Sequence, residues 1–197
     1  MIMRFSVFLA ALLLLAGCYL PLDFEADINI EEKGRYAVRY KGDIIAVTLL
    51  SKISKGKVEG TSEIKKQAAI YRRDLMRDKG FKTVDHKKLA RFKTVYEHQG
   101  DIREAKSFDF VRSNARFFAI QRRKDGLIEL FGDRPPKKYV DGLIERGIDT
   151  RGVLRVWTKA KVLQHNAQQV RQGSPAVYQW NIRSMREPLP SMILQLR

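Results

Sequence analysis

The sequence predicts an α+β domain built mainly on antiparallel strands. Segments with a two-residue apolar repeat recur along the chain and indicate about eight half-buried strands. One segment has the three-to-four-residue apolar repeat of an amphipathic helix, and a second, shorter helix is expected later in the chain. No linker or internal repeat divides the sequence. We therefore predict a single domain over 23–197, with a mostly antiparallel sheet, one long amphipathic helix and one short helix.

The first part of this domain predicts a long hairpin. Apolar residues alternate with polar ones over Phe24–Ile30, Glu31–Gly34 supplies a turn, and alternation resumes over Arg35–Lys41. Gly42 indicates a kink before the apolar run 44–50, which we read as the continuing second strand. Further strands are expected at 81–84, 91–98, 116–122, 127–131, 153–162, 177–182 and 192–196.

The long helix is predicted to begin at Thr61 or Ser62 and to end before Gly80. Its apolar stripe is Ile64, Ala68, Tyr71 and Leu75. The other faces are basic and carry Lys65, Lys66, Arg72, Arg73 and Arg77. These cations form either an ordinary solvated face or a surface that contacts phosphate groups.

The short helix is expected between Asp133 and Arg146, because two prolines follow Asp133 and Gly147 can end the helix. Asp125-Gly126 between two apolar strands predicts a tight hairpin before it. The charged segment 100–114 gives no clear prediction.

The N-terminal segment indicates export. Met1–Arg4 carries one positive charge, and the next 13 residues contain Ser6 as their only polar member. This run is too short to cross a bilayer as a helix, which takes about 20 apolar residues, and has the length of a signal-peptide apolar region. The only cysteine, Cys18, stands where the run ends.

Leu15-Ala16-Gly17-Cys18 resembles the lipobox of bacterial lipoproteins. The resemblance implies a cleaved signal peptide over 1–17, a diacylglycerol anchor with acyl chains such as palmitate on Cys18, and a lipid-anchored tether over 18–22. The alternative is an uncleaved helix in which Cys18 is an ordinary small residue. Tyr19, where an Asp favours inner-membrane retention in enterobacterial lipoproteins, implies the outer membrane where one exists. We therefore expect the protein on the periplasmic face of the cell envelope.

Charge and motif content bound the function. A formal charge of +16 favours anionic partners such as lipid or polysaccharide. His86, His98 and His165 are too far apart in sequence to suggest a metal site, and no nucleotide-binding or hydrolase motif occurs. In the predicted strands, aromatic side chains lie largely on one face and basic side chains on the other. This arrangement argues against a surface on which nucleic-acid bases stack. We expect no cofactor, no metal and no enzymatic activity.

The segment Val162–Ile182 resembles LppM-type bacterial lipoproteins in five matched residues, which are His165, Asn166, Ala167, Gly173 and Trp180. The two ends of the chain share this resemblance and the middle, from about Ser51 to Gly152, does not. It implies a membrane-tethered α+β domain that binds lipid or glycolipid. The matched residues are expected to be structural, with Asn166 and Gly173 in left-handed turn conformations and Trp180 in the core.

These observations favour a membrane-anchored envelope module that binds or assembles other molecules. The predicted site residues are Cys18 for lipidation and the five cations of the long helix for an anionic ligand. A structural subunit of a trans-envelope secretion or conjugation complex is the alternative. A hydrolase acting on envelope glycan or lipid is a third possibility and would need two facing carboxylates in a cleft.

Overall fold

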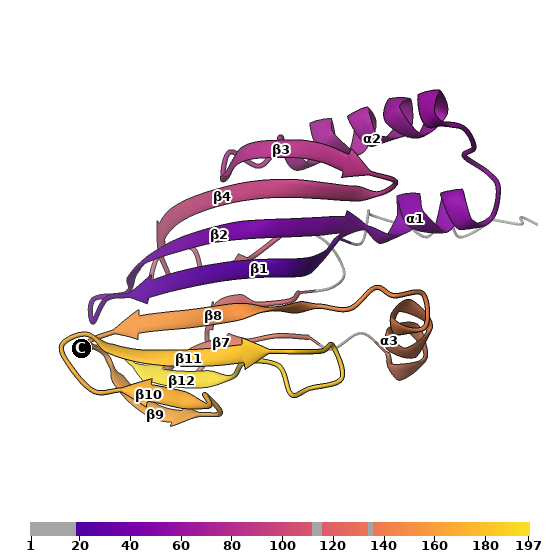
Figure 1. Ribbon diagram of the computed structural model, residues 1–197. Helices are drawn as coiled ribbons and strands as arrows, with labels where there is room; N and C mark the ends of the chain where they lie inside the picture. Colours follow the sequence, from indigo (N-terminus) through magenta and orange to yellow (C-terminus); the bar gives the residue numbers. More distant parts are fainter. Residues whose placement is uncertain (1–18, 112–115, 134–135) are drawn as a thin grey trace, which may run out of the picture.

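A computed structural model describes residues 19–111, 116–133 and 136–197. These residues form a strand-rich α/β domain with two sheets and three helices (Figure 1). The strands are β1 (Tyr19–Ile30), β2 (Arg35–Ala46), β3 (Phe81–Lys88), β4 (Arg91–Asp101), β5 (Ser107–Asp109), β6 (Ala119–Arg122), β7 (Ile128–Phe131), β8 (Arg151–Thr158), β9 (Lys161–His165), β10 (Gln169–Arg171), β11 (Ala176–Ile182) and β12 (Met192–Gln195). The helices are α1 (Val47–Ser54), α2 (Thr61–Leu75) and α3 (Lys137–Ile144).

The larger sheet has seven strands in the order β10-β11-β8-β1-β2-β4-β3. All neighbouring pairs are antiparallel except β1 and β8, which run parallel in the centre of the sheet. A parallel pair needs a long crossover connection, and here the whole segment 31–150 provides it. The predicted hairpin is confirmed as the β1–β2 pair.

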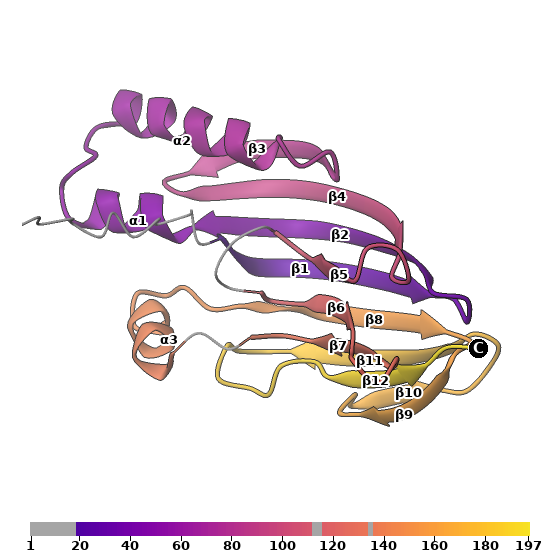
Figure 2. The same ribbon diagram turned by 180° about the vertical axis from the view of Figure 1, so that it is seen from behind.

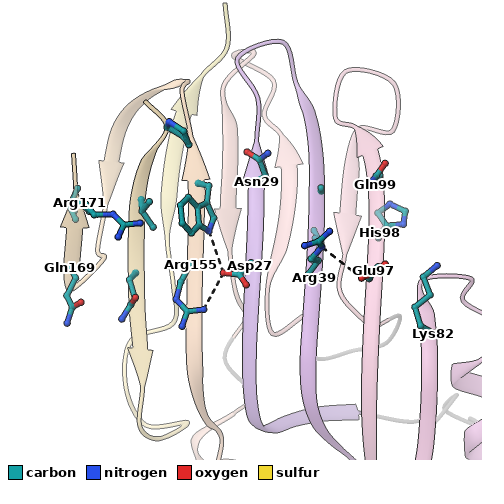
Figure 3. A pocket seen from close by; sticks show the side chains of 17 residues that line it. Asp27, Asn29, Arg39, Lys82, Glu97, His98, Gln99, Arg155, Gln169 and Arg171 are labelled. Carbon is teal, nitrogen blue, oxygen red and sulfur yellow. Dashed lines mark hydrogen bonds and ion pairs between the residues drawn. The ribbon is translucent and has the colours of Figure 1, made fainter. Parts of the chain in front are cut away.

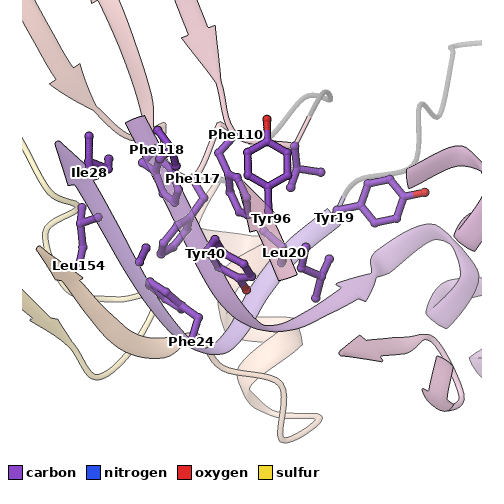
Figure 4. Packing of buried hydrophobic residues seen from close by; sticks show 14 of the residues in the cluster. Tyr19, Leu20, Phe24, Ile28, Tyr40, Tyr96, Phe110, Phe117, Phe118 and Leu154 are labelled. Carbon is purple, nitrogen blue, oxygen red and sulfur yellow. The ribbon is translucent and has the colours of Figure 1, made fainter. Parts of the chain in front are cut away.

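The smaller sheet, in the order β5-β6-β7-β12-β9, packs against one face of the larger sheet, which we call the inner face. Side chains from both sheets form one continuous core (Figure 4). Aromatic rings join the layers. The rings of Phe24 and Phe117 meet edge-on with their centroids 5.4 Å apart, and the centroids of Tyr40 on β2 and Phe110 beside β5 lie 4.5 Å apart. Helix α2 lies beside β3 (Figure 2).

Phe24 lies between two glycines on the neighbouring strands. It pairs with Gly42 of β2 on one side and with Gly152 of β8 on the other. A Cβ on Gly152 would stand 2.5 Å from the Phe24 ring, and a Cβ on Gly42 would stand 2.5 Å from the Phe24 Cβ. The absence of side chains at both positions therefore leaves the space in which the Phe24 ring meets Tyr40 and Phe117.

The apolar run 44–50 was predicted as strand, and this prediction is wrong beyond Ala46. β2 loses its β4 neighbour there, because the N–H of Ala46 bonds to Ala90 O in the turn before β4 begins. The chain then turns into α1, which buries Leu49 and packs Leu50 and Ile53 against the core. An apolar run buried on one side fits either structure, and loss of strand partners decides between them.

Two other boundaries differ from the prediction. β1 begins at Tyr19, so four of the five residues expected to form a tether, 19–22, belong to the central strand and are buried. The single strand predicted over 153–162 is two strands, because the chain leaves the larger sheet after Thr158 and enters the smaller one at Lys161. Among the described residues, twelve strands in two sheets therefore replace the predicted single sheet of about eight.

The remaining predicted elements are present with shifted ends. The long helix is α2 and the short one is α3, which begins at Lys137. The Asp125-Gly126 hairpin joins β6 and β7, with Gly126 at φ +84°. Segment 100–111 contains the short strand β5. The predicted signal peptide and Cys18 lie outside the described residues, and among those described no helix is long and apolar enough to cross a membrane.

Candidate functional site

Helix α2 carries the predicted anionic-ligand residues on its solvent side. The predicted stripe faces inward, with Ala68 and Leu75 buried and Ile64 and Tyr71 partly buried. All five cations, which we call the α2 basic face, are exposed: Lys65, Lys66, Arg72, Arg73 and Arg77.

Three cations of the α2 basic face have partners within the protein. Arg72 Nε donates a hydrogen bond of 2.8 Å to Val84 O on β3, which fastens the helix to the sheet edge. Lys66 Nζ lies 4.0 Å from Glu63 and Arg77 lies 3.6 Å from Asp74, and such exposed pairs contribute little. Lys65 and Arg73 make no hydrogen bond or ion pair with any described residue. These two are the cations most available to a ligand.

Apolar side chains are exposed on the same helix surface. Ile70 is 49% exposed and stands one helical turn from both Lys66 and Arg73. Met76, just beyond the helix, is 39% exposed. The solvent side of this helix therefore shows aliphatic side chains among its cations.

The beginning of β1 is fastened to α2. Tyr19 is 3% exposed, its hydroxyl donates a hydrogen bond of 2.9 Å to Asp74 Oδ2, and its ring meets the ring of Tyr71 edge-on at 6.3 Å. Burial first, and then the carboxylate of Asp74, raises the pKa of Tyr19, which keeps the hydroxyl protonated as a donor. The residue that directly follows Cys18 is therefore held against the basic helix.

A second candidate site lies on the outer face of the larger sheet, which the smaller sheet does not cover. An open groove of about 1060 Å³ crosses all seven strands of this sheet, from β10 at one edge to β3 at the other (Figure 3). Its charged lining residues are Arg39, Lys82, Arg155, Arg171, Asp27 and Glu97. Four cations against two carboxylates leave an excess of two positive charges.

Strand register arranges the groove residues in two rows. One row is charged and runs Gln169, Gln179, Arg155, Asp27, Arg39 and Glu97. Within it Arg155 lies 3.3 Å from Asp27, and Arg39 lies 3.9 Å from Glu97. The neighbouring row is mostly uncharged and runs Arg171, Val177, Trp157, Asn29, Ala37 and Gln99. The two rows give the groove a charged side and a side with one large ring between small residues.

Trp157 is the largest side chain of the uncharged row. Its indole Nε1 faces Asp27 Oδ1 at 3.5 Å, and the guanidinium of Arg171 lies over its ring, 5.5 Å from the centroid. Alternation along the strand predicted that Trp157 points away from the core, which is confirmed. The groove itself was missed, because its rows join residues from six strands whose pairing the sequence does not reveal.

The histidines considered as metal ligands, and the residues matched to LppM-type lipoproteins, make contacts that support the fold. His86 bonds to Leu89 O, and His98 packs on Phe108 and shares a 3.2 Å hydrogen bond with Tyr36. Asn166 does not adopt the expected left-handed conformation, and neither does Gly173; the Asn166 side chain instead accepts the indole hydrogen of buried Trp180. Over the described ranges, no group of three or more His, Cys, Asp or Glu side chains is placed to hold a metal ion.

The fold defines a two-layered, strand-rich α/β domain, and comparisons with known proteins add only distant likeness. No protein-family model and no curated protein matches the sequence. A solved structure that does match is the NMR structure of the folded domain of LppM from Mycobacterium tuberculosis. It is 12% identical, the match covers 89% of this chain and 90% of that one, and the TM-score is 0.41.

Proposed function

We propose that the protein is an exported lipoprotein that acts without catalysis as a binding module at a membrane surface. Cys18 carries the diacylglycerol anchor, and the α2 basic face contacts anionic lipid headgroups. The observation that supports this proposal most directly is the contact of Tyr19 with Asp74 and Tyr71 on α2. Cys18 is covalently adjacent to Tyr19, so an acyl group on it begins one residue from the basic helix.

The anchor and the basic helix then act on the same membrane. Each Lys or Arg near an anionic surface contributes about 1 kcal/mol, and a single acyl chain alone binds only marginally. Ile70 and Met76 add aliphatic surface between the cations and the lipid. The periplasmic face of the envelope and, where one exists, the outer membrane remain part of this proposal, as does the absence of enzymatic activity.

Vesicle co-sedimentation tests the lipid contact. A form that starts at residue 18 and carries Cys18→Ser is mixed with phosphatidylcholine vesicles with or without phosphatidylglycerol. We expect binding only to the anionic vesicles and a loss of binding as salt is raised. Replacing both Lys65 and Arg73 with Gln weakens that binding roughly 30-fold, at about 1 kcal/mol for each cation.

The matched control replaces Lys33 and Lys124 with Gln, which removes the same charge from exposed turns away from α2. We expect this variant to bind nearly as the parent does. Equal losses in both double variants would show that total charge and not the α2 basic face determines binding.

Metabolic labelling with palmitate tests the anchor separately. The full chain should take up label in bacteria that process lipoproteins, and the Cys18→Ser variant should not. Label on the Cys18→Ser variant would refute the lipobox interpretation. Because Tyr19 is already part of β1, the substitution lies directly beside the fold, so circular dichroism of the variant is the necessary control.

A further inference from the structure

We propose that the groove on the outer face of the larger sheet binds an extended glycan that carries carboxylate groups. This site is separate from the α2 basic face. Its floor is the uncharged row, in which Trp157 stands between Val177 and Asn29, and Ala37 follows Asn29. The small side chains of Val177 and Ala37 leave the indole of Trp157 as the one large ring in this row.

The floor has the chemistry that sugar rings require. A pyranose has a face of C–H bonds, which packs on an aromatic ring, and a rim of hydroxyls, which need groups that both donate and accept. Asn29 and Gln99 supply such amides in the row of Trp157, and Gln169 and Gln179 supply them in the adjacent row. Arg171 over the ring and Asp27 at Nε1 hold the indole in place before a ligand arrives.

The charges of the groove select an acidic glycan. The carboxylate of Asp27 faces Arg155, and that of Glu97 faces Arg39. Arg171 on β10 and Lys82 on β3 have no such ion pair with a described residue, and they stand toward opposite ends of the groove. An anionic chain that crosses the strands meets one available cation near each end. A second copy of this protein, which also carries a charge of +16, is repelled from the same surface.

The length of the groove requires a chain and not a single sugar. Five strand intervals separate Arg171 on β10 from Gln99 on β4. At ~4.8 Å for each interval the uncharged row spans about 24 Å. A monosaccharide that covers Trp157 would not contact Arg171 and Gln99 at the same time. It would also not reach Lys82.

The test measures binding of hexagalacturonate to the full-length protein in detergent by tryptophan fluorescence and calorimetry. The protein has two tryptophans, and Trp180 is 1% exposed, so a fluorescence change reports on Trp157. We expect saturable binding that weakens at least tenfold for the methyl-esterified hexamer, in which the sugar chain is kept and the charge is removed. No binding of either hexamer overturns the proposal.

Two variants locate the ligand on the sheet. By calorimetry, Trp157→Ala and Arg171→Gln should each weaken binding at least tenfold, whereas Lys124→Gln, a cation in the β6–β7 turn, should not. Arg171 is exposed on an edge strand, so this variant retains the fold even where Trp157→Ala does not. Equal losses in Arg171→Gln and Lys124→Gln would overturn the assignment.

The same titration separates this site from other polyanion binding. A single-stranded DNA of equal charge is titrated for comparison. If it binds as tightly as hexagalacturonate and depends on Arg171 to the same degree, the groove binds polyanions in general and the glycan proposal is overturned. The double substitution of Lys65 and Arg73 should leave hexagalacturonate binding unchanged. Failure of the glycan site therefore leaves the lipid contact standing, and the reverse also holds.

Discussion

The indole nitrogen of Trp180 donates a hydrogen bond of 2.7 Å to Asn166 Oδ1. The same oxygen accepts the Ser191 N–H at 2.8 Å, and Asn166 Nδ2 donates to Leu189 O at 2.9 Å. One amide thus ties the loop after β9 to β11 in the larger sheet and to the chain that enters β12 in the smaller sheet. Asn166 is therefore a structural residue that connects the two layers.

Asn166→Ala should lower the free energy of unfolding by about 1–3 kcal/mol, because it leaves the part-buried indole N–H of Trp180 without its acceptor. Urea denaturation monitored by circular dichroism measures the change. Asn29→Ala is the control, since Asn29 is exposed and its side chain has no hydrogen-bond partner among the described residues. A change of similar size in both variants would contradict the structural role of Asn166.

Gly152→Ala should destabilise the protein by about 1–3 kcal/mol, because the new Cβ would stand 2.5 Å from the Phe24 ring in the centre of the core. Thermal or urea unfolding gives the value. Gly142→Ala on α3 is the matched control: its Cβ would meet only the end of Arg146, at 3.3 Å, and alanine favours a helix by up to about 1 kcal/mol. A Gly152→Ala variant as stable as the parent would show that the fit around Phe24 is loose.

Stability should fall as the pH rises from 10 to about 12, in part through Tyr36. Burial first, and then the charge of Asp101, raises the pKa of Tyr36 to about 12, above its ordinary value of 10.0. The unfolded chain therefore loses this proton at lower pH than the folded chain does, so the contribution of Tyr36 is complete below pH 10.0 and is lost as the pH approaches 12.

Urea midpoints of the parent and of Tyr36→Phe over this pH range measure that contribution. Other tyrosines and the lysines titrate in both proteins, so the difference in slope isolates Tyr36. We expect a shallower fall in the variant, and parallel curves would contradict the prediction.

Leu89→Asn should stabilise the protein by about 0.5–1 kcal/mol. Leu89 lies in the β3–β4 turn at φ +50°, a left-handed conformation that costs a leucine about 1–2 kcal/mol and that asparagine tolerates better. Its side chain is 47% exposed, so little packing is lost. Leu163→Asn is the control, because Leu163 is 46% exposed on β9 without a positive φ. A gain in the control as large as that at Leu89 would assign the effect to surface polarity instead of backbone strain.

Local patterns predicted those parts of the fold that depend on neighbours in sequence. Alternation located β1 to β4, the Asp125-Gly126 pair located the β6–β7 hairpin, and the stripe from Ile64 to Leu75 located α2. The α2 basic face was predicted because helical spacing alone determines which of its residues face solvent. The parallel pairing of β1 with β8, the second sheet and the outer groove depend on contacts between distant segments, which no local pattern records.

The early start of β1 also has a mechanical consequence. β1 is the central strand, hydrogen-bonded along one side to β2 and along the other to β8. A pull on Tyr19 acts along the strand, first on the β2 pairs, which start at Tyr19, and then on the β8 pairs, which start at Asp23. The hydrogen bonds are therefore sheared instead of being opened one by one. The domain thus resists tension from its N-terminal side with a strand that is paired along both of its edges.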